Sequence, residues 1–267
     1  MKRSWLRLSL MVLGVLGLVL GGMAWYWLAT FPDVPALAKQ NPTETALMAA
    51  RVADATESGR PYKRQWSWVA LSEISPHLQR AVVAAEDASF FSHEGFDWEG
   101  IKVAMERNLE AGKIERGGST ITQQVAKNLF LTQDRSFLRK AREAMITRAL
   151  EKDLPKTRIL EIYLNIAEWG EGVYGAEAAA RHYFFKRAKD LSADESALLA
   201  AMLPSPLKYD PLRLTPFLVK RQHQILSWMG ATAMTAPTSG QPHPQPVSAK
   251  VKKRKADAPS KRSGEKH

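Results

Sequence analysis

The chain has 267 residues, 45% of them hydrophobic and 24% charged, with a formal net charge of +11 and no cysteine. That balance is typical of a folded chain, so disorder along the whole length is excluded. Eight basic and two acidic residues between Lys250 and His267 supply six of the eleven net positive charges. The remainder is only mildly basic, so nucleic acid is not an expected partner. The lack of cysteine is compatible with an oxidising compartment.

The N-terminal segment has the pattern of a membrane anchor. Residues 1–7 are basic, and residues 8–31 (LSLMVLGVLGLVLGGMAWYWLATF) carry no charge. As a helix this run would be about 36 Å long, enough to cross a hydrocarbon core of about 30 Å. Trp25, Tyr26 and Trp27 lie at its far end, where aromatic rings favour the membrane interface. We therefore expect one transmembrane helix, with residues 1–7 cytoplasmic and the domain that follows in the periplasm.

A cleaved signal peptide is the alternative interpretation of this segment. Its apolar core would usually span about 7–15 residues and end at small residues. Gly21, Gly22, Ala24 and Ala29 keep that alternative open. The length of the run and its aromatic flank favour an uncleaved anchor in the inner membrane.

The rest of the chain reads as a connector, a helical domain and a tail. Residues 32–60 contain prolines and little periodicity, and we expect a juxtamembrane connector with one short helix over about 44–55. Residues 64–70 (RQWSWVA) have the one strand-like pattern, and the spacing beyond them predicts a compact, mainly α domain over residues 61–232. Its expected helices begin at Pro76 and then cover about 98–111, 119–131, 137–153, 156–167, 174–184, 194–203 and 216–229. Residues 233–267 are polar and basic, which predicts a disordered tail.

The first stretch that could carry chemistry is residues 82–97 (VVAAEDASFFSHEGFD), where an apolar helical face ends in Glu86 and Asp87. Burying a carboxylate without a partner is costly, so the pair either faces solvent or meets a cation. If the helix continues, Glu86, Phe90 and His93 form one stripe about 10 Å long. Asp87 points about 100° away, where it can bond near His93 or to an arginine. A structural role and a metal site are the alternatives, and the single histidine argues against the metal.

The second stretch is residues 116–131 (RGGSTITQQVAKNLFL), in which Ser119 follows two glycines and is in position to cap a helix. Three- and four-residue spacing gives that helix a polar stripe of Thr120, Gln123, Gln124 and Lys127. Such a stripe suits hydrogen bonding to a hydroxyl-rich ligand, with a solvated face as the alternative. Residues 111–118 have the composition of a loop that closes over a long substrate.

The third stretch is residues 139–143 (RKARE). Arg139 and Glu143 are four residues apart and could form a surface ion pair worth less than about 1 kcal/mol. Arg142 and Arg148 add positive charge to the same helix.

Five patterns then occur in a fixed order along the chain. They are EDxxFxxHxG at 86–95, GGSTxTQQxxKN at 117–128, RKxxE at 139–143, KxxILExYLN at 156–165 and GxGxYG at 170–175. Together they resemble the signature motifs of the peptidoglycan glycosyltransferases, glycosyltransferase family 51. With one N-terminal anchor and no second domain expected, the chain is most similar to the monofunctional members of that family.

The resemblance implies a lysozyme-like, mainly α fold that polymerises lipid II into linear β-1,4 glycan strands, with inversion and release of undecaprenyl diphosphate. It implies lipid II, the nascent glycan strand and the membrane as partners, with division or cell-wall synthesis proteins as further candidates. It implies no tightly bound cofactor and no resident metal, although a divalent cation could assist at the donor diphosphate. The residues that match are Glu86 and Glu143 as catalytic, Asp87, Phe90 and His93 as supporting, and Thr120, Gln124, Lys127, Asn128, Arg139 and Lys140 as substrate-binding.

Chemistry supports this assignment. An acceptor hydroxyl must lose its proton as it attacks, and Glu86 is the candidate base. The leaving diphosphate needs cations more than an acid, and Lys127, Arg139 and Lys140 supply them. We therefore expect the base and these cations to face each other across one groove. Glu143 would orient the cations, help to hold a metal or donate a proton, and the sequence does not decide among these roles.

Two other functions stay open: a lytic muramidase or transglycosylase that cleaves peptidoglycan, and a non-catalytic cell-wall scaffold. A muramidase would have little use for the lysine and arginine set. GEGVYG at 170–175 also fits a dinucleotide-binding pattern, but no strand is expected before it, and we interpret it as a tight interhelical turn. SPLK at 205–208 matches a transpeptidase motif by chance.

Overall fold

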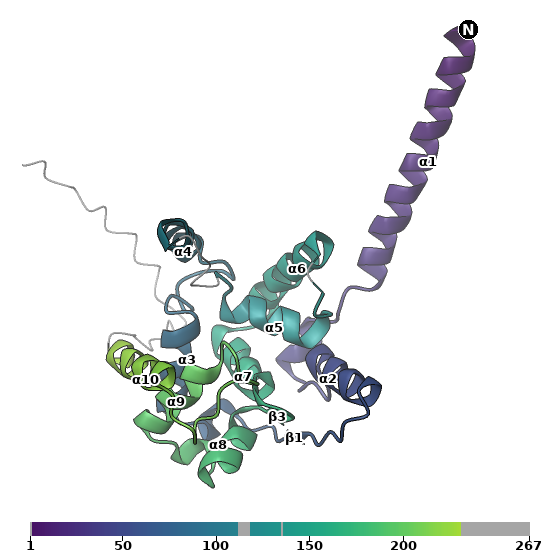
Figure 1. Cartoon of the computed structure of the whole chain (residues 1–267). Helices are drawn as coiled ribbons and strands as arrows, with labels where there is room; N and C mark the ends of the chain where they lie inside the picture. The colour runs from purple at the N-terminus through teal and green to yellow at the C-terminus, as the bar shows by residue number, and fades with distance from the viewer. Residues whose placement is uncertain (1, 112–117, 135, 231–267) are drawn as a thin grey trace, which may run out of the picture. The chain divides into compact units, whose positions relative to one another are not determined.

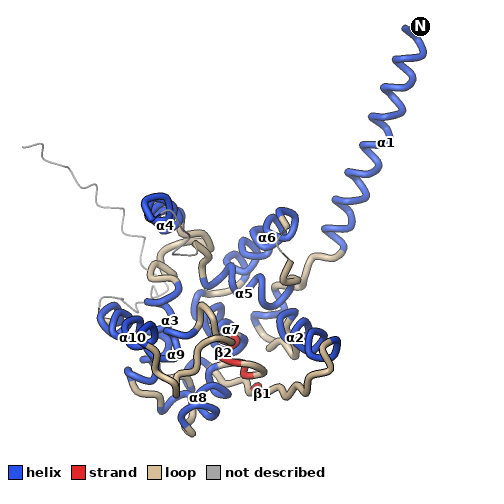
Figure 2. Tube along the Cα trace, viewed as in Figure 1, coloured by secondary structure: helices blue, strands red, loops and turns tan. Residues whose placement is uncertain are grey.

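The computed structural model describes residues 2–111, 118–134 and 136–230. These residues are mainly helical, as the sequence predicts (Figures 1 and 2). The α-helices are α1 (Lys2–Ala29), α2 (Ala46–Glu57), α3 (Pro76–Glu86), α4 (Trp98–Ala111), α5 (Ile121–Phe130), α6 (Phe137–Asp153), α7 (Lys156–Ile166), α8 (Ala176–Phe184), α9 (Ala193–Met202) and α10 (Pro216–Met229). Short 3₁₀ helices cover Pro35–Ala38 (η1), Leu71–Glu73 (η2) and Ala188–Asp190 (η3). The predicted tail, residues 233–267, lies outside the described part, as do residues 112–117 of the predicted loop.

The helix starts follow from local capping chemistry. A serine or threonine hydroxyl accepts a backbone N–H of the first turn at the N-caps Thr45, Ser75, Thr120, Ser136, Ser192 and Thr215. Proline follows the cap at α3 and α10, where its missing N–H costs nothing. The bounds of α4, α6 and α10 match the prediction, and those of α2, α5, α7, α8 and α9 differ by one or two residues.

Two groups of packed helices build the domain. Helices α3, α9 and α10 contact one another, and α5 contacts both α6 and α7 (Figure 1). The connector joins this core, because Val34 and Leu37 are buried in it and α2 packs on α5. Arg158 of α7 holds the connector, donating to the carbonyls of Leu37 and Gln40 at 2.8 and 3.0 Å.

A small sheet was only partly predicted. Strand β1 covers only Gln65–Trp66, and strands β2 (Glu168–Gly170) and β3 (Val173–Tyr174) were not predicted (Figure 2). The strand order is β1-β3-β2, with β1 parallel and β2 antiparallel to β3. The segment 170–175, interpreted as a tight interhelical turn, therefore holds strand β3 and the bend at residues 171–172 of a β-hairpin between α7 and α8. Gly172 makes that bend at φ +73°, where a Cβ would collide with the Lys63 carbonyl.

Helix α1 contains one candidate membrane span, Leu10–Ala29, by length and apolar composition. A helix of this length is sufficient for a hydrocarbon core of about 30 Å. The length and composition of this span agree with the predicted transmembrane helix.

Candidate active site

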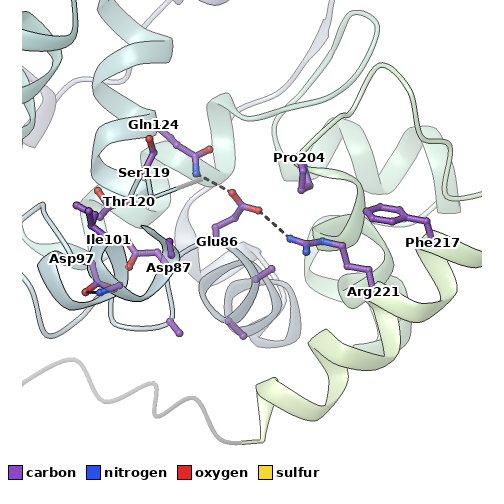
Figure 3. Close-up of a pocket in the computed structure, with 16 residues that line it drawn as sticks. Glu86, Asp87, Asp97, Ile101, Ser119, Thr120, Gln124, Pro204, Phe217 and Arg221 are labelled. Atoms are coloured by element: carbon purple, nitrogen blue, oxygen red, sulfur yellow. Dashed lines mark hydrogen bonds and ion pairs between the residues drawn. The ribbon is translucent and has the colours of Figure 1, made fainter. Parts of the chain in front are cut away.

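A pocket of about 530 Å³ opens where the C-terminal end of α3 meets the N-terminal end of α5 (Figure 3). Glu86 and Asp87 line it from α3, Thr120 and Gln124 from α5, and Arg221 from α10. Segments distant in sequence thus supply a carboxylate pair, hydrogen-bonding side chains and a cation to one concave site, as is typical of small-molecule sites.

Glu86 is the last residue of α3, so the expected continuous stripe of Glu86, Phe90 and His93 is wrong. Asp87 leaves the helical conformation at φ −162° and ψ 75°, and the chain turns through residues 88–97 instead. Phe90 consequently points into the core, where it is fully buried. The early helix end leaves the Glu86 side chain at the pocket rather than along a helix surface.

Two groups from other helices contact the Glu86 carboxylate (Figure 3). The Gln124 side-chain amide donates to Oε2 at 2.9 Å, and a guanidinium nitrogen of Arg221 lies 4.0 Å from Oε1. The Glu86 side chain is only 14% exposed. Burial raises its pKa above the usual value, although Gln124 and Arg221 act in the opposite direction. A carboxylate with a raised pKa is a better proton acceptor, which suits a general base.

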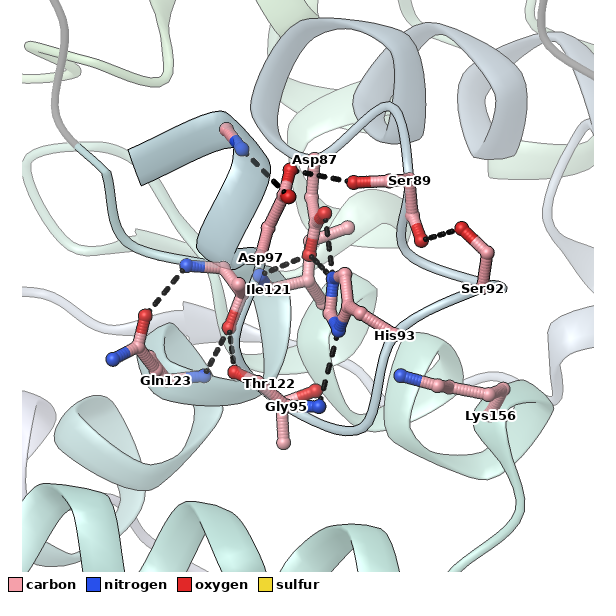
Figure 4. Close-up of polar contacts among 12 residues, drawn as sticks. Asp87, Ser89, Ser92, His93, Gly95, Asp97, Ile121, Thr122, Gln123 and Lys156 are labelled. Carbon is pink, nitrogen blue, oxygen red and sulfur yellow. Dashed lines mark hydrogen bonds and ion pairs between the residues drawn. The ribbon is translucent and has the colours of Figure 1, made fainter. Parts of the chain in front are cut away.

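Asp87 lines the pocket, and its carboxylate also bonds to groups inside the protein (Figure 4). Its carboxylate lies 2.9 and 3.1 Å from His93 Nε2 and accepts the backbone N–H of Ile121 at 2.9 Å. Ile121 is the first residue of α5, where a negative charge is favourable to the helix. Of the partners expected for Asp87, a group near His93 or an arginine, the structure shows His93; the bond from Ile121 also ties the end of α3 to the start of α5.

His93 is fixed from both ring nitrogens. The backbone N–H of Gly95 donates to Nδ1 at 3.0 Å, so the hydrogen of the neutral ring is on Nε2 and is donated to Asp87. The Gly95 carbonyl accepts a hydrogen bond of 2.8 Å from the Thr120 hydroxyl. The loop after α3 is therefore bonded at several points to the N-terminus of α5.

The N-cap of α5 is Thr120, not Ser119. Thr120 and Gln123 form a reciprocal capping box, with bonds of 3.2 and 2.9 Å, and both side chains are buried. Thr120 and Gln123 of the predicted polar stripe therefore use their side chains to cap α5. Gln124 is the member that reaches Glu86.

The predicted cations form a second cluster around Glu143. Arg139 donates to Oε2 of Glu143 at 2.7 Å, Lys140 pairs with Oε1, and the Glu143 side chain is only 3% exposed. The pKa of Lys127 is below its usual value, mainly because the side chain is buried. The charges of Arg139 and Lys140 lower this pKa further, and Glu143 acts in the opposite direction. Lys127 therefore interacts electrostatically with the charged residues of this cluster. Asn128, beside it on α5, is largely buried.

The site residues therefore fall into two neighbouring groups. Glu86, Asp87, Thr120 and Gln124 line the pocket, whereas Lys127, Arg139, Lys140 and Glu143 do not. Helix α5 joins the groups, because Gln124 and Lys127 are three residues apart on one face. The cation beside Glu86 is Arg221, which the sequence analysis missed. The sequence did contain a sign of it: Arg221 lies between Leu218 and Ile225 at the spacing of the buried face of α10.

The fourth motif supports the site from behind. Buried Asn165 exchanges bonds of 2.9 Å with both backbone groups of Val69, and its carbonyl accepts the Trp66 indole N–H at 2.7 Å. Lys156 pairs with Glu151 at 2.8 Å and lies 4.5 Å from the centre of the Phe90 ring. These residues hold α7 against the strand region and the loop that carries His93.

The described residues do not fit a protein-held metal at the cationic cluster. Both Glu143 oxygens already bond to Arg139 and Lys140. Among residues 2–111, 118–134 and 136–230, no three His, Cys, Asp or Glu side chains are grouped so as to hold an ion.

Comparisons with known proteins identify the class of enzyme to which this fold and pocket belong. The family profile described as Transglycosylase matches residues 52–230. The biosynthetic peptidoglycan transglycosylase of Dechloromonas aromatica is 47% identical over 226 residues, covering 84% of this chain and 95% of the relative. Proteins of that name from Nitrosospira multiformis and Laribacter hongkongensis are 50% identical over 194 residues, covering 73% of this chain and 84% or 85% of the relative. The chain belongs to the transglycosylase family and is a glycosyltransferase.

Proposed function

We propose that this glycosyltransferase is a peptidoglycan glycosyltransferase that polymerises lipid II into β-1,4 glycan strands, with Glu86 as the general base. The observation that carries this proposal is the buried Glu86 carboxylate at the pocket, with a raised pKa and contacts to Gln124 and Arg221. The names of the relatives and the family match support the same substrate class.

In the proposed reaction, the acceptor 4-hydroxyl gives its proton to Glu86 as its oxygen attacks the donor anomeric carbon. The bond from that carbon to the diphosphate breaks on the opposite face, which inverts the configuration. A carboxylate that gains its proton from a hydroxyl needs a raised affinity for it, and burial of Glu86 supplies this. Asp87 and His93 are proposed to hold Glu86 in position through the start of α5.

The leaving diphosphate is proposed to bind at Lys127, Arg139 and Lys140. A diphosphate carries its own negative charge, so cations held in place before the reaction stabilise it as it departs. Glu143 is proposed to fix the positions of Arg139 and Lys140, since each of its oxygens bonds to one of them. Thr120 and Asn128 are largely buried, and both are proposed to serve the donor side by fixing the position of α5, although Thr120 also lines the pocket.

The domain plan also stays a proposal: residues 1–7 cytoplasmic, 8–31 transmembrane, 32–60 a connector, 61–232 the catalytic domain in the periplasm and 233–267 a tail. The apolar span Leu10–Ala29 and the basic residues before it support an inner-membrane anchor with a cytoplasmic N-terminus. Anchoring suits a lipid-linked substrate, because both then meet at the bilayer surface.

Two substrates separate this proposal from cleavage. The purified full-length chain is incubated with lipid II and, separately, with finished sacculi. We expect glycan polymer from lipid II and no soluble fragments from sacculi. Fragments from sacculi with no polymer from lipid II would favour a muramidase, and no product from either would favour a scaffold.

A further inference from the structure

We propose that Tyr163 is a positioning residue for the catalytic base: its hydroxyl holds the Gln124 amide in the orientation that donates to Glu86. This proposal rests on the proposed role of Glu86 and adds a residue that does not line the pocket. Tyr163 lies on α7, which packs against α5.

The three side chains form one chain of hydrogen bonds. The Tyr163 hydroxyl donates to Gln124 Oε1 at 3.2 Å, and Gln124 Nε2 donates to Glu86 Oε2 at 2.9 Å. Tyr163 is only 1% exposed, so water does not replace its hydroxyl readily. The base at the end of α3 is therefore linked through α5 to a fully packed residue of α7.

The orientation of the amide matters because its two ends are similar in size and opposite in polarity. A flipped Gln124 would turn its oxygen toward the Glu86 carboxylate and lose the stabilising donation. After a flip the Tyr163 hydroxyl would have to accept from Nε2, and its own buried hydrogen would lose Oε1 as an acceptor; this cost opposes the flip. Donation by the hydroxyl also polarises the amide, which strengthens the bond that Nε2 makes to the carboxylate.

The charged groups around Glu86 do not replace this effect. Arg221 faces it from α10, and Asp87 adjoins it at the end of α3. The Gln124 bond and Arg221 lower the pKa of Glu86, whereas burial and Asp87 raise it. Burial also raises the pKa of Tyr163 well above its usual value, so the hydroxyl keeps its proton throughout the working pH range. Tyr163 therefore stays a donor while Glu86 titrates.

The first test is the pH profile of kcat/KM for lipid II polymerisation by full-length Tyr163→Phe. Without the hydroxyl the donation to Glu86 weakens, its pKa rises, and the acidic limb moves to higher pH by about 0.5 unit. The matched control is Tyr183→Phe, which removes another buried hydroxyl, bonded at 2.8 Å to the Trp169 carbonyl away from the pocket. Its limb should stay in place. An unmoved limb in Tyr163→Phe, or an equal shift in both variants, would overturn the proposal.

A double-mutant cycle tests whether Tyr163 acts through Gln124. In a Gln124→Met background, Tyr163→Phe should add no further shift, because the link is already broken. A full shift in that background would contradict the proposal. If Tyr163→Phe does not fold, 3-fluorotyrosine at position 163 keeps the shape and donates more strongly, so the limb should move to lower pH. An unchanged or raised limb there would count against the proposal.

A readout without turnover separates this proposal from the function it rests on. The carboxyl ¹³C signal of Glu86, assigned by its loss in Glu86→Gln, should titrate at higher pH in Tyr163→Phe. If Glu86→Gln polymerises normally, the base assignment fails, whatever Tyr163 does. If Glu86→Gln is inactive and the ¹³C titration is unmoved by Tyr163→Phe, only the Tyr163 proposal fails.

Discussion

Glu86 and Arg221 face each other across the pocket, with 4.0 Å between carboxylate and guanidinium, although they are 135 positions apart in sequence. Their side chains are 14% and 22% exposed. At this separation and burial, Arg221 counters part of the desolvation that raises the pKa of Glu86. Helix α10 is thereby part of the site and not only of the core.

Replacing Arg221 tests that relationship. Without a cation facing Glu86, the pKa of the carboxyl rises further, so Arg221→Met should move the acidic limb of kcat/KM to higher pH. Below the limb we expect activity to fall about 10-fold. Arg221→Lys should keep part of the effect because the charge remains. The measurement is the pH profile with lipid II, and a limb that stays in place in Arg221→Met would show that this ion pair does not tune the base.

Asp87→Asn tests the tie between α3 and α5. The Asp87 carboxylate accepts from both His93 and the Ile121 N–H, and an asparagine has one neutral acceptor oxygen in its place. The free energy of unfolding should therefore fall by about 1–3 kcal/mol. For a domain of this size that is a decrease in Tm of about 2–10 °C. Asp54→Asn, on the exposed face of α2, is the control and should leave Tm unchanged. Thermal unfolding of both variants checks this, and equal Tm values would refute the tie.

Glu143→Gln tests the cationic cluster. One of the two bonds to Arg139 and Lys140 must be lost, because an amide nitrogen cannot accept. Losing one charged hydrogen bond of a buried carboxylate should cost about 1.5–3 kcal/mol, and kcat/KM for lipid II should fall because the cations lose their positions. Glu94→Gln removes the partner of a surface pair with Arg148 and should cost less than about 1 kcal/mol. Denaturant unfolding and steady-state kinetics measure both, and a Glu143→Gln enzyme with normal kinetics would rule out the proposed role.

The raised pKa of Glu86 also predicts a pH-dependent stability. Its folded pKa lies above its unfolded value, so its favourable contribution is present below the unfolded pKa and is lost as pH rises through the folded pKa. Glu86→Gln has no titrating carboxyl at this position, so it does not lose stability as Glu86 does when the pH rises. Its Tm should therefore exceed that of the wild type at about pH 8 and approach it at about pH 4. The same Tm difference at both pH values would mean that Glu86 does not titrate as its burial requires.

The sequence predicted helices well and the short sheet poorly. Helices such as α6 and α10 repeat their apolar residues over several turns, so their bounds follow from local spacing. Strands β2 and β3 are three and two residues long; they pair with each other, and β3 also pairs with β1, about a hundred residues earlier. A pattern that short carries no periodicity from which to predict a strand.

The site was predicted in its parts more than in its arrangement. Glu86, Asp87 and Gln124 share the pocket, as their motifs suggested. The end of α3 at Glu86 was missed, because the sequence after it holds no proline or glycine until Gly95 and the turn is fixed by Asp87 bonding to α5. Arg221 was missed because only packing of α10 against α3 brings it to Glu86.

The most direct measurement is the turnover of lipid II by full-length Glu86→Gln beside Glu94→Gln, with both shown to be folded. The amide keeps the shape of the side chain and cannot accept the hydroxyl proton, so we predict a loss of about 10²–10⁴-fold for Glu86→Gln and none for the control. Polymerisation by Glu86→Gln within a few-fold of the wild-type rate would contradict the account.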